Sequence, residues 1–157
     1  SLIFLIHQTR KRKAYKKRFQ ELMNAPIKEI KTKKVNTIPK ETVKSVMKLL
    51  EQFEKSHDYI SSGITLSSLA KTFETNSKYL SQLINQHKGK SFNSYINQLR
   101  INFTVEKLKT DARFRKYSIK AIAGEVGFNT TESFSKAFYK NTGIKPSFFI
   151  KELEKKQ

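Results

Sequence analysis

Two short polar stretches, around residues 78–85 and 131–139, combine residue types and a spacing suited to reading the edges of DNA bases. Residues three or four apart share one side of a helix, and the polar residues of each stretch recur at that spacing. They are Lys78, Ser81, Gln82 and Asn85 in the first stretch, and Thr131, Glu132, Ser135 and Lys136 in the second. Asn or Gln can pair with adenine, Lys with guanine O6 and N7, and Ser or Thr with several bases. Glu132 could accept a hydrogen bond from cytosine N4, or could act only as a cap or a repulsive charge at the helix start.

Both polar stretches belong to an internal repeat. Residues 64–96 align with residues 118–150 at a shift of 53 positions, which becomes 54 after one extra residue in the turn. Apolar positions coincide throughout, and Gly89 falls on Gly143. Each unit predicts a short helix, a tight turn and a second helix, which together form a helix-turn-helix. The two motifs are expected over about 64–87 and about 118–142.

The turns and helix starts predict contacts of a second kind. Gly127 can adopt a positive φ in the second turn. Asn76 or Ser77 in the first unit, and Thr130 in the second, can cap the helix that follows. Because most polar contacts to DNA go to phosphate, helix starts and nearby basic residues are candidate phosphate contacts. These candidates are Ser77, Lys88, Arg100, Thr130 and Lys140. Arg100 could equally form an internal salt bridge.

A long helix is expected between the two units, over about 92–109. An apolar stripe at helical spacing, which includes Tyr95, Ile96 and Leu99, supports it. Eighteen residues make a helix roughly 27 Å long, close to one DNA turn of about 34 Å. The fold class predicted for residues 39–157 is therefore all-α, with two helix-turn-helix subdomains joined by a long linker helix and preceded by a basic N-terminal helix.

The composition favours a polyanion as the partner and argues against catalysis. The 157 residues carry a formal net charge of +19, so nucleic acid or an anionic membrane surface is the natural partner. Cysteine is absent, which excludes disulfides, thiolate metal sites and a cysteine nucleophile. The three His residues are scattered, and the five Gly form no phosphate-binding loop. We therefore expect no enzyme activity, no metal and no cofactor.

Residues 1–38 are predicted to lie outside the DNA-binding domain. Residues 1–40 hold 12 basic and two acidic residues, and the apolar run 2–6 directly precedes the most basic stretch. This order matches the end of a transmembrane helix that leaves the membrane into a basic cytoplasmic flank. The alternative is a solvated basic tail. A basic helix is expected over 7–23 and a linker over 27–38, and the start at Ser1 suggests a piece of a larger protein.

The sequence resembles the DNA-binding domain of the AraC/XylS family of bacterial transcription regulators over about residues 40–152. The resemblance lies in LSSLAKTF at 66–73, SKYLSQLI at 77–84, GKSFNSYINQLRI at 89–101 and SIKAIAGEVGFNTTESFSKAFYKNTGIKPSFF at 118–149. It implies two helix-turn-helix subdomains that bind promoter DNA, usually to activate transcription together with RNA polymerase. The family's base readers map onto Lys78, Ser81, Gln82, Thr131, Glu132, Ser135 and Lys136.

Three positions depart from the family pattern. Gln82 stands where Arg is frequent, the connection 110–117 is several residues longer than usual, and Ile150 replaces a common basic residue. The long connection and the stretch TNSKYLSQLIN resemble the subgroup from Bacteroidetes-type bacteria. That subgroup implies an upstream sensor region and a membrane span. It therefore implies a cytoplasmic domain tethered to the inner membrane through the segment before residue 7, with residues 1–18 against an anionic membrane surface.

The preferred interpretation is sequence-specific binding of double-stranded DNA, with two recognition helices in successive major grooves. The first alternative is a nonspecific nucleoid or RNA-binding protein that uses charge alone. The second is a membrane-surface module driven by residues 1–34.

Overall fold

The computed structural model describes residues 2–25 and 39–155, and every regular element in these ranges is a helix. The α-helices are α1 (Leu2–Asn24), α2 (Lys40–Ser56), α3 (Leu66–Thr72), α4 (Ser77–Lys88), α5 (Phe92–Thr110), α6 (Ile119–Glu125), α7 (Thr131–Thr142) and α8 (Pro146–Glu154). Two 3₁₀ turns, η1 (Asp58–Ile60) and η2 (Phe114–Lys116), follow α2 and α5. The all-α prediction is confirmed. The linker expected over 27–38 lies entirely outside the described residues.

Short polar side chains begin the helices of both helix-turn-helix units. Asn76 caps α4 by accepting from the Tyr79 amide at 2.8 Å, and Thr130 caps α7 by accepting from the Ser133 amide at 3.1 Å. Each such cap contributes about 1 kcal/mol. Gly89 and Gly143 end the same two helices in the left-handed conformation. Of the two caps considered for α4, the structure selects Asn76.

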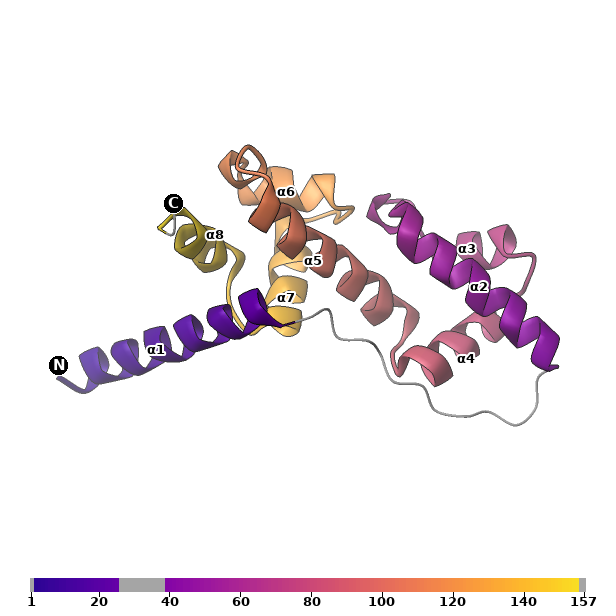
Figure 1. The fold of residues 1–157 in the computed structure, drawn as a ribbon, viewed down its shortest axis with the longest axis horizontal. Coiled ribbons are helices and arrows are strands. Elements are labelled where there is room, and N and C mark those ends of the chain that lie inside the picture. Colours follow the sequence, from indigo (N-terminus) through magenta and orange to yellow (C-terminus); the bar gives the residue numbers. More distant parts are fainter. Residues whose placement is uncertain (1, 26–38, 156–157) are drawn as a thin grey trace.

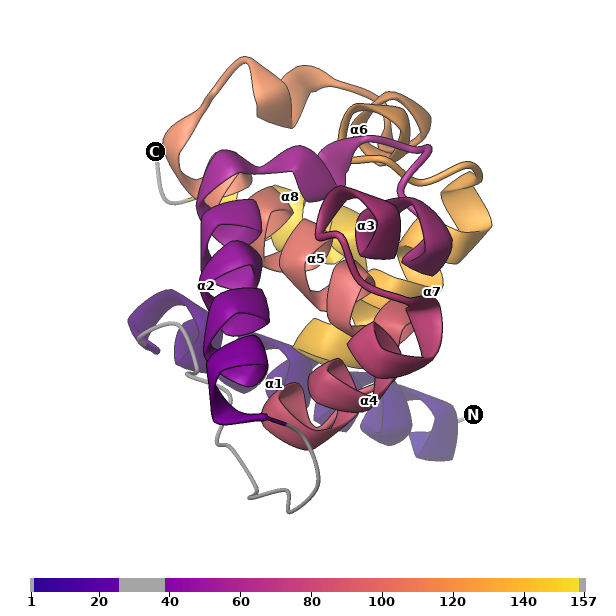
Figure 2. The same cartoon turned by 90° about the vertical axis from the view of Figure 1, so that its right-hand side faces the viewer.

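The helices form two apolar cores that share α5. Leu50, Leu83 and Tyr95 are fully buried in the first core, which α2, α3, α4 and the start of α5 enclose. Leu108 and Phe134 are fully buried in the second core, between the end of α5 and helices α6, α7 and α8. Figure 1 shows α5 running from one subdomain to the other, and Figure 2 views the molecule from the side of the first subdomain. The linker helix therefore belongs to both cores.

The N-terminal helix α1, expected to lie outside the DNA-binding domain, packs on the second subdomain. Phe19 is only 2% exposed, and its ring meets that of Phe149 edge-on at 5.1 Å. Tyr15 meets Phe148 in the same way at 5.5 Å. Arg18 Nε donates to the carbonyl oxygen of Thr142 at 3.0 Å. The residues of α1 that reach the core recur at helical spacing: Tyr15, Phe19, Leu22 and Met23. In the described chain, no helix has the length and apolar character that crossing a membrane requires.

The unusually long connection after α5 folds back and packs against the end of that helix. Phe114 is 2% exposed, and Arg115 is buried with its Nη1 donating to the Leu108 carbonyl at 2.7 Å. The Lys107 ammonium lies 4.5 Å from the centre of the Phe114 ring. The extra residues therefore complete the second core and satisfy a helix C-terminus.

The two helix-turn-helix units use the same turn with different residues. Gly127 has φ +88, as predicted, and Glu74, which aligns with it in the repeat, has φ +53. A left-handed conformation costs a residue with a side chain about 1–2 kcal/mol, which glycine avoids at the expense of greater chain entropy in the unfolded state.

We expect Glu74→Gly to raise the free energy of unfolding by about 0.5–1 kcal/mol, because it relieves the strained turn. Urea denaturation measures the change as a higher midpoint with an unaltered slope. The control is Glu74→Ala, which removes the same carboxylate but keeps the Cβ and should bring no gain. An equal gain from both variants would assign the effect to the charge of Glu74.

Candidate nucleic-acid interface

The first candidate recognition helix, α4, turns its apolar side inward and its polar side to solvent. Leu80, Leu83 and Ile84 are 0% exposed. The predicted base readers of the opposite side remain accessible: Lys78, Gln82 and Asn85 are exposed, and Ser81 is partly buried. The Asn76 cap orients the first turn of this surface. The four side chains predicted from spacing therefore share one solvent-facing surface.

The second candidate recognition helix, α7, repeats this arrangement. Phe134 and Phe138 are 0% exposed, while Thr131, Glu132 and Lys136 are exposed and Ser135 is partly buried. Glu132 Oε1 and Lys136 Nζ form an ion pair at 3.0 Å, with both side chains 78% exposed. Such a solvated pair contributes little stability, so it opens at low cost. Thr130, not Glu132, caps α7. The carboxylate of Glu132 is therefore free of a capping role and can accept a hydrogen bond from a base or stay paired with Lys136.

Three of the five candidate phosphate contacts lie at accessible positions next to these surfaces. Ser77 is the first residue of α4, Thr130 precedes α7, and Lys140 is exposed in the last turn of α7. Both helices have 12 residues, and their N-terminal amide groups carry a partial positive charge that attracts anions. These three residues remain candidates.

Lys88 leaves the candidate set because its ammonium is held inside the first subdomain. Its Nζ lies 2.8 Å from Glu54 Oε1, and its side chain is only 14% exposed. The Tyr95 hydroxyl donates to the same carboxylate oxygen at 2.7 Å. Burial, together with the hydrogen bond to Glu54, raises the pKa of Tyr95 far above its usual value. This cluster joins the end of α4 to α2 and α5.

Arg100 also leaves the set, because it is buried where the two subdomains meet. Its Nε donates to the Tyr59 carbonyl and its Nη2 to the Ser61 carbonyl, each at 2.7 Å. Its guanidinium carbon lies 5.5 Å from the centre of the Phe128 ring. Burial lowers the pKa of Arg100. Within the described residues no acidic side chain pairs with it, so both the predicted phosphate contact and the internal salt bridge are replaced by bonds to carbonyl oxygens.

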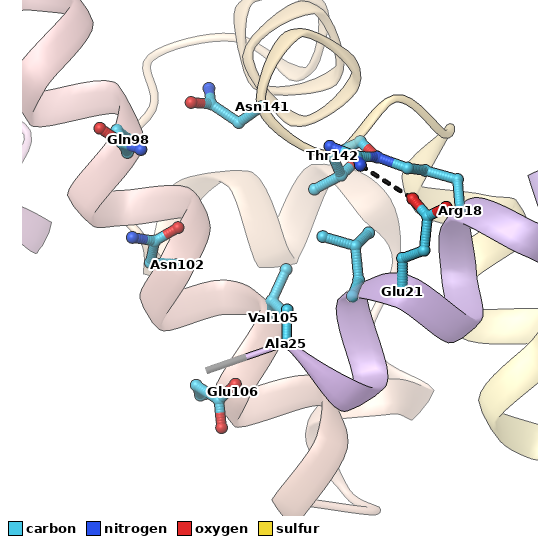
Figure 3. A pocket seen from close by; sticks show the side chains of 10 residues that line it. Arg18, Glu21, Ala25, Gln98, Asn102, Val105, Glu106, Asn141 and Thr142 are labelled. Carbon is cyan, nitrogen blue, oxygen red and sulfur yellow. Dashed lines mark hydrogen bonds and ion pairs between the residues drawn. The ribbon is translucent and has the colours of Figure 1, made fainter. Parts of the chain in front are cut away.

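Hollows lie along α1. One, of about 310 Å³, lies between α1, α5 and α7 and is lined by Arg18, Glu21 and the amides of Gln98, Asn102 and Asn141 (Figure 3). Another, of about 570 Å³, lies over α7. Among the described residues, no group of three or more His, Asp or Glu could hold a metal ion.

The sequence model of the family described as "Helix-turn-helix domain" matches residues 69–152, more than half of the chain. The chain belongs to the AraC-type helix-turn-helix family. The raffinose operon transcriptional regulatory protein RafR of Pediococcus pentosaceus is 28% identical over 119 residues, which make up 73% of this chain and 42% of RafR. The chain spans 28–42% of the length of the curated relatives that it matches.

Solved structures share the AraC-type fold. The C-terminal domain of AraT, a response regulator from Geobacillus stearothermophilus, has a TM-score of 0.58 and 29% identity over 69% of this chain and 84% of that domain. The DNA-binding domain of AdpA, solved with a target DNA, has a TM-score of 0.56 and 16% identity over 74% of this chain and 95% of that one. This AraC-type domain is a sequence-specific DNA-binding domain of the kind that transcription regulators carry.

Proposed function

We propose that the domain binds promoter DNA with α4 and α7 in two successive major grooves. The observation that carries this proposal is the repeated arrangement of α4 and α7, each capped at its start and each turning a polar surface to solvent. The 19 residues of α5 make a helix roughly 28 Å long. Since successive grooves on one face of the duplex are about 34 Å apart, a shared helix of this length suits two reading heads.

The side chains divide into two roles under this proposal. Lys78, Ser81, Gln82 and Asn85 of α4 and Thr131, Glu132, Ser135 and Lys136 of α7 contact base edges. Ser77, Thr130 and Lys140 contact phosphates and fix the register of the domain on the duplex. Lys136 is released from its ion pair with Glu132 when a guanine or a phosphate takes the place of the carboxylate.

Lys78→Ala is expected to weaken binding to the selected site by about 1–3 kcal/mol and to relax the base preference at one position. Selection from random duplexes with the parent protein supplies the site, and titration of that site and of point variants of it gives the affinities. Lys48→Ala is the matched control, since Lys48 is an exposed lysine of α2 outside both recognition helices.

The outcomes separate the candidate functions. Equal affinity and equal base preference for Lys78→Ala and the parent would remove Lys78 from the readers. If the parent enriches no sequence at all, the net charge of +19 acts without base readout, as in a nonspecific nucleic-acid-binding protein.

We also propose that the whole protein is a membrane-tethered activator of the Bacteroidetes-type subgroup, with a sensor region upstream and RNA polymerase as a partner. The apolar run 2–6 supports the tether, because it continues without a break into the basic turns of α1. Fractionation of cells that produce the whole protein tests the tether: recovery in the membrane pellet, resistant to high salt, is expected. Recovery in the supernatant would reject it.

A further inference from the structure

Helix α1 carries the densest run of basic residues in the sequence. Seven basic residues fall within nine positions, and all seven are exposed: Arg10, Lys11, Arg12, Lys13, Lys16, Lys17 and Arg18. The single acidic residue of α1, Glu21, pairs with Arg18 at 3.0 Å. Neither the two subdomain cores nor the recognition surfaces use the rest of this charge. A partner with closely spaced negative charges is the natural counterpart of this surface.

The packing of α1 brings this basic surface next to the second recognition helix. Tyr15 and Phe19 anchor α1 to the rings of Phe148 and Phe149, and the end of α1 reaches α7 (Figure 1). The hollow of about 570 Å³ is lined by Lys11 and Tyr15 of α1 and, from α7, by Glu132, Ser135, Lys136 and Tyr139. Burial, together with hydrogen bonding to Tyr139, raises the pKa of Tyr15. Lys11 thus borders the same surface as the proposed base readers of α7.

We propose that α1 is a third DNA-binding element, whose basic residues contact the phosphates that flank the base pairs read by α7. This inference rests on the proposed function and extends it to residues before the family domain. A duplex carries one negative charge per about 1.7 Å of axis, so it supplies the closely spaced negative charges that complement the exposed lysines and arginines of α1. Contacts of this kind raise affinity for every sequence and select none.

Large apolar residues of α1 pack against the protein core, which favours DNA over a lipid surface as the partner of this helix. A helix that lies in a membrane interface needs an apolar side to bury. Between residues 7 and 25, the large apolar side chains of α1 are Tyr15, Phe19, Leu22 and Met23, and all of them pack against the second core. The charge of α1 also argues against a role in blocking α7, because a helix that competes with DNA for a reading surface would be acidic.

The test is a pair of variants with the same change of charge. Lys11→Gln removes a charge beside α7, whereas Lys48→Gln removes one from an exposed lysine of α2, outside α1 and both recognition helices. In the full chain, Lys11→Gln should weaken binding to the selected duplex and to unrelated duplexes alike, about threefold to tenfold. It should also reduce the salt slope by about 1. Lys48→Gln should change the affinity less than twofold.

The result is separable from the proposed function, because Lys78→Ala is scored by base preference and Lys11→Gln by affinity and salt slope. Equal affinity and salt slope for Lys11→Gln, Lys48→Gln and the parent would overturn the inference, while site selection by the parent would still stand. Tighter DNA binding by Lys11→Gln would also overturn it, in favour of a blocking role. If Lys11→Gln lost binding to vesicles of phosphatidylglycerol and phosphatidylethanolamine but bound DNA as tightly as the parent, the inference would be overturned in favour of a membrane surface.

Discussion

Arg100→Met is expected to lower the free energy of unfolding by about 3 kcal/mol or more and to uncouple the two helix-turn-helix units. Arg100 supplies the donors for the Tyr59 and Ser61 carbonyls, both at 2.7 Å. Hydrogen bonds from a charged donor contribute about 1.5–3 kcal/mol each, and a buried carbonyl left without a donor is costly. Methionine keeps the aliphatic bulk of the side chain, so the loss reports the hydrogen bonds and not a cavity.

The same variant should also impair DNA binding, because Arg100 stands between the subdomains. Its guanidinium contacts Phe128 in the second turn, and a Cβ added to the neighbouring Gly127 would collide with the Ile60 carbonyl. The second helix-turn-helix is thus packed directly against the segment that Arg100 holds. When that segment loosens, the distance between α4 and α7 is no longer fixed, and both helices cannot meet their grooves in one geometry.

Urea denaturation measures the stability change, and titration of the selected site, with its natural spacing and with one base pair inserted, measures the coupling. The parent should reject the altered spacing, and Arg100→Met should discriminate less between the two spacings. Arg100→Lys is the control, since lysine keeps the charge but has no planar fork to reach both carbonyls. The stability of Arg100→Lys should lie between that of the parent and that of Arg100→Met. An unchanged urea midpoint for Arg100→Met would refute the structural role.

The local parts of the fold were predictable because their signals are local. The repeat identified both helix-turn-helix units and the helix between them, and capping chemistry predicted Asn76 and Thr130 as possible caps. The left-handed Glu74 was not recognised, since glutamate has no preference for that conformation. The signal was nevertheless present in the alignment of Glu74 with Gly127. Aligned positions of a repeat can therefore share a backbone conformation even where their residue types differ.

The errors concern basic residues whose partners lie far away in the sequence. Arg100 bonds to carbonyls 39 and 41 positions earlier, and Lys88 pairs with Glu54. In a chain with 32 Lys and Arg, an isolated basic residue is typical of the surface, and only the tertiary contacts distinguish the buried ones. The packing of α1 had a signal in the helical spacing of Tyr15, Phe19, Leu22 and Met23, but the surrounding charge favoured a tail instead.

Phe19→Ala is expected to destabilise the second subdomain by about 3–5 kcal/mol, the usual cost of removing a buried phenylalanine ring. The ring of Phe19 meets Phe149 at 5.1 Å, and Phe149 meets Phe138 at 5.8 Å, edge-on in both cases. Phe138 continues to Phe134 at 5.8 Å, and Phe134 to Phe128 at 5.4 Å. The ring of Phe19 thus belongs to a chain of aromatic contacts that extends through α7 to the second turn, and a cavity in place of the ring would remove contacts that support this chain.

Urea denaturation of Phe19→Ala tests this result, with Ile6→Ala as the control because Ile6 belongs to the same helix and is 43% exposed. Hydrogen exchange adds a local readout, since the amides of α1 should lose protection in Phe19→Ala well before those of α5. Equal midpoints for the two variants would show that α1 is not part of the core. If α1 both packs on the core and contacts phosphates, Phe19→Ala must also lower DNA affinity at temperatures where α7 remains folded, although it changes no charge. A loss of affinity without a loss of charge links the anchoring of α1 to DNA binding, which a flexible basic tail would not do.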